Sequence, residues 1–407
     1  MLQCSTADTR HAAVNILVLN CGSSSAKFAV IDAVTGDEKI SGNAQRLGTA
    51  EATLDWKRDG VKRSQSIADA DHNAALRAAV ALLGEEGLLS TLGGVGHRVV
   101  HGGSRFSEST RVTPDVIAQI EACIRLGPLH NPPNLMGILI AQELLPSLAQ
   151  VAVFDTAFHQ TMPARAYTYP VPHEWAEKYG VRRYGFHGTS HRYVTREAQR
   201  MLGLGANEGA LITAHLGNGC SAAAVLHGKS VDTTMGLTPL EGLVMGTRSG
   251  SVDPAIIGHV SRVSGMTHEA VLDALNKRSG LLGMSGLSND LRTLEAAADE
   301  GHEGARLALE VFSFVLARHI AGLVVSLGKL DALVFTGGIG ENSARVREAV
   351  INHLGFLGLT LDPAANARAV RGEAGRISAS VAPQALVVPT NEERMIARDT
   401  AALVDTH

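Results

Sequence analysis

Residues that could bind phosphate occupy a short stretch near the start of the chain. The segment ILVLNCGSSSAKFAVID, residues 16–32, is an apolar run that breaks into Gly-Ser-Ser-Ser and resumes around a single lysine. Successive backbone N–H groups in a glycine-rich turn form a concave anion site, to which a neighbouring lysine adds charge. Asn20, Ser23, Ser25 and Lys27 therefore predict a phosphate-binding hairpin, although an ordinary polar turn would explain the same residues.

A second loop of this kind follows half a chain later. The segment LITAHLGNGCSAAAVLHGKSVD, residues 211–232, repeats the order of apolar strand, polar residue, Gly/Ser loop and second strand. We predict a second phosphate cradle from His215, Leu216, Gly217, Asn218 and Gly219. The two hairpins together indicate an internally duplicated α/β fold, with chance likeness between glycine-rich hairpins as the alternative.

A third glycine turn, TGGIGEN, occupies residues 336–342. Gly338 and Gly340 would let a flat ligand approach the backbone, and Asn342 is expected to start the following helix at its positive end. A routine strand–helix connection would look the same, but three glycine turns in one chain favour a nucleotide. The sequence has no GxxxxGK[ST] motif, and this turn does not fit GxGxxG, so P-loop and Rossmann folds are disfavoured.

Two arginines point to a second, anionic substrate. In GVGHRVVHGG, strand alternation places Arg98 and Val100 on one face, which suits a carboxylate with a short alkyl tail. Arg248 is the only cation in the apolar, glycine-rich segment MGLTPLEGLVMGTRSG, and such an arginine usually has an anionic partner. A surface ion pair for Arg98 and a structural partner for Arg248 are the alternatives.

Histidines and one aspartate complete the set of reactive side chains. His187 and His191 stand four residues apart in YGFHGTSH, but the glutamate of HExxH is missing, so zinc is disfavoured. Gly-Thr-Ser after His187 resembles a helix start, and we expect His187 just before that helix. Asp155 ends the apolar run QVAVFD, where α/β sheets typically present functional groups; a helix cap is its alternative role.

These residues need strands and helices to position them. Val/Ile/Leu/Ala-rich runs bounded by Gly, Asn or Asp predict strands at 14–20, 26–32, 94–101, 150–155, 210–215, 221–227, 331–336 and 385–389. Helical patterns lie between them, including 113–127, 303–328 and 391–405. Mixed strands and helices over this length predict an α/β protein with helices covering the sheets.

The composition excludes several classes of function. A net charge of -4 and 4% aromatic residues give no reason to expect nucleic acid or an anionic membrane as a partner. The four cysteines lack metal-ligand spacing and suit a reducing cytosol. The most apolar helix candidate, residues 311–328, is interrupted by Arg318 and His319, short of the ~20 residues that a membrane span needs.

Nine strings in order resemble those of the acetate kinase family, short-chain acyl kinases of the superfamily that includes sugar kinases, actin and heat-shock ATPases. They are NCGSSSAK, GHRVVHGG, PLHNPPN, VFDTAFHQTMP, YGFHGTSH, HLGNG, MGLTPLEGLVMGTRSG, TGGIGEN and PTNEE. The resemblance implies two duplicated actin-like, ribonuclease-H-like α/β domains with an interdomain active-site cleft. The expected parts are a disordered extension at 1–13, domains at 14–155 and 156–384, and a helix within 385–407 that packs back on the first domain.

The resemblance also implies a reaction. It is reversible, Mg²⁺-dependent phosphoryl transfer between ATP and acetate, by direct in-line attack of the carboxylate, giving acetyl phosphate and ADP. Mn²⁺ is expected to substitute for Mg²⁺, and a propionate kinase of the same family is the alternative. We expect a cytoplasmic homodimer formed largely through the C-terminal domains, with no nucleic acid or membrane partner.

Roles for individual residues follow from the same resemblance. Mg²⁺ would be held by Asn20 and Glu392. The acyl pocket would be formed by Arg98, Val100, Leu129 and Pro239, and the catalytic set would be Asp155, His187 and Arg248. ATP would contact Lys27, the loop from His215 to Gly219, and further residues that flank the adenosine: Asp290, Leu291, Arg292, Gly338, Ile339, Gly340, Glu341 and Asn342.

Two other functions remain as alternatives at this point. A sugar or glycerol kinase on the same fold would need a carboxylate to deprotonate a hydroxyl nucleophile, whereas the Arg98–Val100 face favours a carboxylate substrate. A nucleotide-gated, non-catalytic module would bind and slowly hydrolyse nucleotide without dependence on acetate. It would give Arg248 and His187 no reason to lie beside the phosphate.

Overall fold

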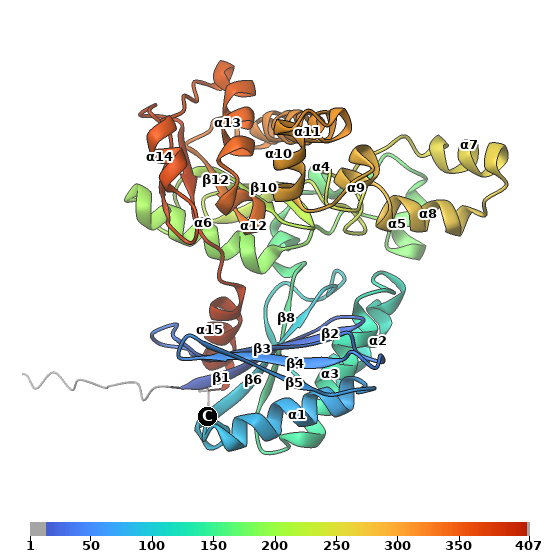
Figure 1. Cartoon of the computed structure of the whole chain (residues 1–407), viewed down its shortest axis with the longest axis vertical. Coiled ribbons are helices and arrows are strands. Elements are labelled where there is room, and N and C mark those ends of the chain that lie inside the picture. Colours follow the sequence, from blue (N-terminus) through green and yellow to red (C-terminus); the bar gives the residue numbers. More distant parts are fainter. Residues whose placement is uncertain (1–13, 405–407) are drawn as a thin grey trace, which may run out of the picture. The chain divides into compact units, whose positions relative to one another are not determined.

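The computed structural model describes residues 14–404, and the chain divides into two compact units (Figure 1). Unit 1 consists of the chain up to Gly102, Glu108–Phe154 and the C-terminal segment from Glu392; unit 2 consists of Gly103–Ser107 and Asp155–Asn391. The expected extension at 1–13 lies outside the described residues. The chain returns to unit 1 at Glu392, later than the expected position 385, because residues 384–387 form a strand of unit 2.

An eight-stranded sheet forms the centre of unit 1, in the order β5-β4-β3-β2-β1-β6-β8-β7. Strands β1 to β5 are joined by hairpins and pair antiparallel, whereas β6 and β8 continue the sheet in parallel with β1. The strands are β1 (Asn15–Cys21), β2 (Ser25–Asp32), β3 (Glu38–Gln45), β4 (Thr53–Arg58), β5 (Val61–Ser66), β6 (Leu92–Val99), β7 (Thr110–Arg111) and β8 (Gln150–Phe154).

Helices cover both faces of this sheet (Figure 1). Successive side chains of a strand point to opposite faces, so β1 contributes to two cores. Leu17 and Leu19 pack in the core beneath α1 (His72–Glu85) and α3 (Asn131–Leu144), with α2 (Pro114–Ala122) alongside α3. Ile16 and Val18 pack in the core beneath α15 (Glu392–Val404).

Close packing of α15 on β6 depends on a glycine. A Cβ atom added at Gly96 would lie 2.4 Å from Thr400 Oγ1 and 2.6 Å from Ile396 Cγ2. We expect Gly96→Ala to destabilise the protein by about 1–3 kcal/mol, because overpacking forces the helix off the sheet. Thermal unfolding measures the effect. Gly84→Ala, on the exposed side of α1, is the matched control and should leave Tm unchanged or raise it, since its Cβ meets only one atom, at 3.9 Å. Equal Tm values for wild type and Gly96→Ala would contradict this packing.

Unit 2 repeats the arrangement of the first sheet. Its strand order is β11-β10-β9-β12-β14-β13. Strands β11, β10 and β9 pair antiparallel, β12 and β14 continue in parallel with β9, and β13 pairs antiparallel with β14. The run β11-β10-β9-β12-β14 therefore has the same pairing directions as β3-β2-β1-β6-β8, which confirms the expected duplication. The strands are β9 (Ala210–Leu216), β10 (Cys220–Leu226), β11 (Lys229–Thr233), β12 (Ala332–Thr336), β13 (Gly375–Arg376) and β14 (Gln384–Val387).

The helices of unit 2 surround this sheet. They are α4 (Ala164–Tyr167), α5 (His173–Tyr179), α6 (Gly188–Leu202), α7 (Ala255–Ser264), α8 (His268–Lys277), α9 (Gly280–Ser285), α10 (Leu291–Asp299), α11 (Glu303–Leu327), α12 (Gly337–Asn342), α13 (Ala344–His353) and α14 (Pro363–Arg368). Among the described residues, α11 is the one helix long and apolar enough to cross a bilayer. Its Phe312, Leu316 and Ile320 are buried in unit 2, as expected of a core helix.

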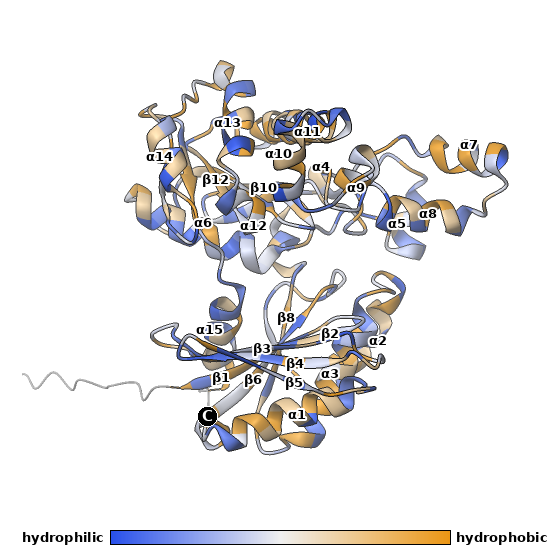
Figure 2. Ribbon diagram, viewed as in Figure 1, coloured by the Kyte–Doolittle hydropathy of each residue, from blue (hydrophilic) through white to orange (hydrophobic). Residues whose placement is uncertain are grey.

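All eight strands expected from apolar runs are present. Within residues 14–404, six further strands are additional, namely β7, β11, β13 and the consecutive run β3, β4 and β5. These three strands carry mainly hydrophilic side chains (Figure 2). One face of β3 and β4 is nevertheless apolar, since Ile40, Ala44 and Leu54 are buried. Helix α11 begins at the expected residue, and α2 begins at the expected Pro114 with the Thr113 side chain as its N-cap.

Candidate functional site

The first glycine loop is a tight hairpin between β1 and β2. The turn occupies residues 22–24 and is closed by a bond from Gly22 N to Ser25 O of 2.8 Å. Lys27 lies on β2 rather than in the turn, and it pairs directly across from Asn20 on β1. Because paired residues point to the same face of a sheet, the hairpin presents an amide and an ammonium group side by side.

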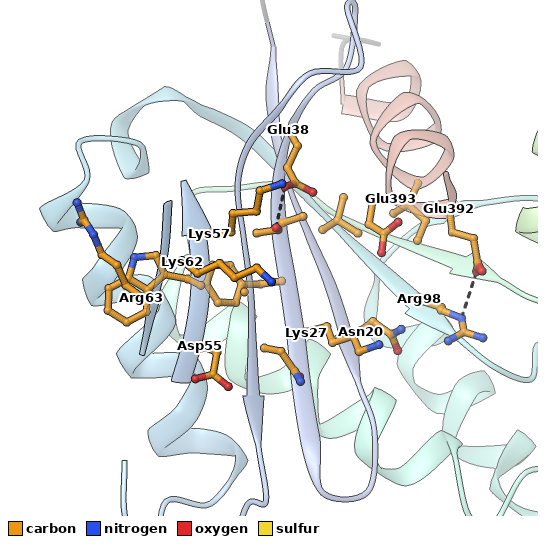
Figure 3. A pocket seen from close by; sticks show the side chains of 18 of the residues that line it. Asn20, Lys27, Glu38, Asp55, Lys57, Lys62, Arg63, Arg98, Glu392 and Glu393 are labelled. Carbon is orange, nitrogen blue, oxygen red and sulfur yellow. Dashed lines mark hydrogen bonds and ion pairs between the residues drawn. The ribbon is translucent and has the colours of Figure 1, made fainter. Parts of the chain in front are cut away.

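A cavity of about 830 Å³ lies over this face of unit 1 (Figure 3). Four of the residues singled out from the sequence line it together: Asn20, Lys27, Arg98 and Glu392. Arg98 comes from the end of β6 and Glu392 from the first residue of α15, with 3.8 Å between Arg98 Nε and Glu392 Oε2. Both side chains are about one-fifth exposed, so they can meet a ligand while the protein holds them in place.

The donors in this cavity suit a hard divalent cation. Mg²⁺ takes oxygen ligands, keeps several waters and is usually held by one or two carboxylates together with substrate phosphates. The Asn20 amide and the Glu392 carboxylate supply such oxygens on one cavity wall. Within residues 14–404 no group of three or more His, Cys, Asp or Glu could hold a metal ion by itself. The set therefore fits Mg²⁺ that arrives with a nucleotide better than a permanently bound metal.

The residues expected around an acyl group are divided between the units. Val100 follows the end of β6, half-buried like Arg98, with its N–H bonded to Asn134 Oδ1 at 2.9 Å. Leu129 precedes α3 and is 61% exposed. Neither lines the cavity of Figure 3. Pro239 belongs to unit 2, where its carbonyl accepts a hydrogen bond from Arg248.

The second glycine loop is the hairpin between β9 and β10, with its turn at residues 217–219. His215 and Ser221 face each other across the two strands, as Asn20 and Lys27 do in unit 1. The His215 ring stacks on that of His187, with 4.3 Å between ring centroids, and its Nδ1 lies 2.8 Å from Ser190 Oγ. Unit 2 therefore gathers two imidazoles beside the loop.

His187 directly precedes α6, as expected, with a φ of 55° that places it in the left-handed region. Residues other than glycine rarely adopt this backbone conformation, and such backbone strain is often found at functional sites. The next residue, Gly188, donates its N–H to Asp155 O at 2.8 Å, and a Cβ at Gly188 would lie 2.2 Å from that oxygen. Asp155, which is 1% exposed, and His187 are thus held together at the start of α6.

Arg248 lies beside the same loop. A Cβ built on Gly219 would be 3.5 Å from an Arg248 guanidinium nitrogen and 3.4 Å from His187 Nε2. The guanidinium donates to Pro239 O at 3.1 Å, and no carboxylate within residues 14–404 pairs with it. Burial lowers the pKa of Arg248, but not enough to remove its charge at neutral pH. The arrangement can therefore stabilise negative charge beside residues 217–219.

The residues expected near an adenosine occupy the starts of two helices in unit 2. Asp290 caps α10, and its ion pair with Arg292 at 2.5 Å lowers the pKa of the carboxyl to about 2. Leu291 is 6% exposed, so its side chain belongs to the core and only its backbone could face a ligand. Asn289 Nδ2 donates to Asn218 Oδ1 at 3.1 Å, which connects this helix start to the second glycine loop.

The expectation that Asn342 starts a helix is wrong. The glycine-rich segment itself forms the short helix α12, which Asn342 ends, and Ser343 caps the following α13. The Asn342 side chain bonds Gly338 O and Arg371 N, both at 2.9 Å. Glu341 Oε1 accepts from Gly337 N at 2.9 Å and Thr390 N at 3.1 Å. Both side chains thus stabilise the turn, while a Cβ at Gly338 would meet nothing within 4 Å.

Two groups of site residues were missed in the sequence. Asp55, Lys57 and Lys62 line the cavity of unit 1 from β4 and β5 (Figure 3). The sequence signal that could have indicated them is the run of polar residues over 53–66, which has little apolar character. In unit 2, Ser221 contacts His187 and His191, and Thr213 contacts His191. Thr213 lies two residues before His215 on β9, and Ser221 lies directly opposite His215 on β10. These relations follow from the register of the two strands, which the sequence does not show.

Comparisons with known proteins identify what the chain is similar to. Residues 15–398 match the model of the Acetokinase family. The curated acetate kinase of Ectopseudomonas mendocina is 55% identical over 394 residues, which cover 97% of this chain and 100% of that protein.

Solved structures agree with the sequence comparisons. The acetate kinase of Porphyromonas gingivalis has a TM-score of 0.92 at 42% identity, covering 97% of this chain and 100% of that one. A propionate kinase from Francisella tularensis has a TM-score of 0.92 at 44% identity, covering 96% of this chain and 99% of that one.

Proposed function

This chain belongs to the acetokinase family, and we propose from that premise that it is an acetate kinase. Its fold is of the actin-like ATPase type, as in the acetate kinase structures that it matches. The proposed reaction is reversible transfer of the γ-phosphoryl group of ATP to acetate, which yields acetyl phosphate and ADP. The observation that supports it best is the pair of cationic or proton-donating side chains, Arg248 and His187, beside the second glycine loop.

The nucleophile in this reaction needs no general base. An aliphatic carboxyl group has a pKa near that of Glu, about 4.3, so acetate is already ionised at pH 7. The difficulty is electrostatic, since an anion must approach a polyanion. We assign Arg98 to holding the acetate carboxylate, and Lys27 to the nucleotide phosphates. Binding then places the carboxylate oxygen in line with the bond between the β,γ-bridging oxygen and the γ-phosphorus. This lowers the activation barrier because the entropy of orienting the two substrates is lost on binding and not in the transition state.

The other part of catalysis is stabilisation of charge in the transition state. Phosphoryl transfer spreads negative charge over three equatorial oxygens. Arg248 carries a guanidinium with no competing carboxylate within the described chain, and His187 presents Nε2 on the side of the same loop. We assign both to the γ-phosphoryl oxygens. Asp155, held against the start of α6, is assigned to positioning because no proton has to be abstracted.

Mg²⁺, with Mn²⁺ as a substitute, is the proposed cofactor, held by Asn20 and Glu392 together with the phosphates of ATP. When bound, it would neutralise charge on the terminal phosphates. Arg98 Nε lies 3.8 Å from Glu392 Oε2, so the ion pair orients this carboxylate beside the place proposed for acetate.

The acid that the enzyme prefers is part of the proposal. One methylene group changes discrimination by only ~1–3 kcal/mol, so propionate should be a weaker but real substrate. Propionate preference is the second candidate, because a propionate kinase at 44% identity is among the similar solved structures, beside an acetate kinase at 42%. Acetate comes first because the curated relatives at 54–56% identity are acetate kinases.

The test is Mg²⁺-dependent ADP release from ATP with acetate, propionate, butyrate or no acid, while hydroxylamine traps acyl phosphate. We expect most hydroxamate with acetate and about 5- to 150-fold lower kcat/KM with propionate. A larger value for propionate would make this a propionate kinase. ADP release that no acid stimulates would reject the acyl kinase assignment, and release without Mg²⁺ or Mn²⁺ would reject the metal assignment.

Assembly and location complete the proposal. We propose a cytoplasmic homodimer built largely from the C-terminal halves of two chains, without nucleic acid or membrane partners. Sedimentation equilibrium of the purified chain tests the dimer against the 42.7 kDa of one copy.

A further inference from the structure

A chain of hydrogen bonds connects His187 to the interior of unit 2. Ser221 Oγ lies 2.8 Å from His187 Nδ1 and also 2.8 Å from His191 Nε2. On its other edge, His191 Nδ1 lies 2.7 Å from Thr213 Oγ1. Ser221, His191 and Thr213 are fully buried, so water does not compete for these bonds.

Three elements bring these groups together. Helix α6 carries His187 just before its first residue and His191 one turn later. Because α6 packs on β9, the two imidazoles lie against the β9–β10 hairpin. Ser221, on β10, then reaches both rings with one hydroxyl group. The serine therefore connects a half-buried histidine, His187, to a fully buried one, His191.

The protonation of His191 limits how the protons can be placed along these hydrogen bonds. Burial, together with the neighbouring His159 and His215, holds the pKa of His191 well below its usual range, so the ring is neutral and has one donor and one acceptor nitrogen. A neutral His191 allows two directions for these hydrogen bonds. In the direction that leaves His187 a donor at Nε2, Thr213 donates to His191 Nδ1 and His191 Nε2–H donates to Ser221. The serine hydroxyl in turn donates to His187 Nδ1. In this direction, a neutral His187 carries its proton on Nε2.

We propose that Ser221 is a positioning residue whose hydroxyl holds the imidazole of His187 in the tautomer protonated on Nε2. That nitrogen is the one on the side of residues 217–219, 3.4 Å from where a Cβ on Gly219 would lie. The inference rests on the proposed function, in which His187 donates a hydrogen bond to the γ-phosphoryl group. Without Ser221, the neutral ring would divide its proton between Nδ1 and Nε2, and a fraction of the enzyme would present an acceptor to an anion.

The tautomer can be observed directly. Long-range ¹H–¹⁵N correlation spectra of the full chain with ¹⁵N-labelled histidine report which ring nitrogen carries the proton, and His187→Gln identifies the signals. At pH 8 we expect Nε2–H in the wild type, a mixture of tautomers in Ser221→Ala, and Nε2–H again in Ser221→Thr, which keeps the hydroxyl. The matched control is Ser230→Ala, since Ser230 is an equally buried serine bonded to His159 Nδ1 at 2.8 Å.

Kinetics supply the second readout. Ser221→Ala should lower kcat about tenfold, the effect of losing one hydrogen bond that orients a catalytic group, while KM for ATP and acetate changes less than about twofold. Ser221→Thr should recover most of the rate, and Ser230→Ala should keep it. An Nδ1–H wild type, or the same His187 tautomer in wild type and Ser221→Ala, would overturn the proposal. Absence of acyl kinase activity in the wild type would reject the proposed function and leave the tautomer result standing.

Discussion

Replacing Arg248 by alanine is expected to lower kcat by about 10³- to 10⁵-fold, while the Kd for ATP changes little. The expectation follows from the place of the guanidinium. It lies beside residues 217–219, bonds only a carbonyl and a thioether within the described chain, and stays charged at neutral pH. Its charge is therefore available to oxygens that become more negative as the phosphoryl group moves. Steady-state kinetics and nucleotide titration measure the two quantities separately.

Two variants make this result interpretable. Arg200→Ala removes an exposed arginine of α6, in the same unit, and should keep full activity. Arg248→Lys keeps the positive charge but loses the planar fork of donors, so it should recover only part of the rate. A kcat loss below tenfold in Arg248→Ala would remove this residue from the catalytic set.

The second large effect is expected from Arg347, a fully buried arginine on α13. Its guanidinium donates to Asn366 Oδ1 at 2.7 Å, Asn366 O at 2.7 Å and Gly340 O at 2.9 Å. Burial lowers its pKa to about 10, so it remains charged at pH 7. Each buried acceptor that loses its donor costs about 1–3 kcal/mol. Arg347→Ala should therefore destabilise the protein by at least about 3 kcal/mol, and differential scanning calorimetry should show Tm lower by about 6 °C or more.

The same helix provides the control for Arg347. Arg345 is half exposed and pairs with Asp299 at 2.8 Å, so Arg345→Ala should change stability by less than about 1 kcal/mol. Arg347→Met fills most of the space and leaves the three acceptors without a donor, which separates the hydrogen bonds from the cavity. Because Gly340 belongs to α12, both Arg347 variants should also weaken ATP binding. A Tm within 2 °C of the wild type for Arg347→Met would contradict the role of these bonds.

Much of the framework could be predicted because its signals are local. The strands that flank both glycine loops are apolar runs with clear ends, and their repeated order predicted the duplication that the two sheets confirm. The position of His187 just before a helix followed from the residues after it. Strands β3 and β4 could not be predicted because only one of their faces is buried, and β5 because it is exposed along its whole length; short polar strands lack the composition of a core.

Other features depend on conformation that the sequence conceals. Glycines disfavour helices, so nothing in Gly-Gly-Ile-Gly indicated that α12 begins at Gly337. Asn342 and Ser343 are equally good N-cap residues, and in the structure Ser343 has that role. The link from His187 through Ser221 to His191 requires the register of a hairpin and the packing of α6, both set by contacts distant in sequence.

The return of the chain to unit 1 at Glu392 has a consequence for synthesis on the ribosome. The core that contains Ile16, Val18 and Val151 is closed by Ile396 and Ala397 of α15, which is translated more than 230 residues after β8. One face of the first sheet therefore stays open to solvent until residues 392–404 have been translated, although its strands emerge early. Nascent chains that stall before Glu392 would expose this apolar face, and chaperones that bind hydrophobic surface would recognise it. Since Glu392 is also the proposed metal ligand, a chain that cannot complete this unit cannot assemble its metal site either.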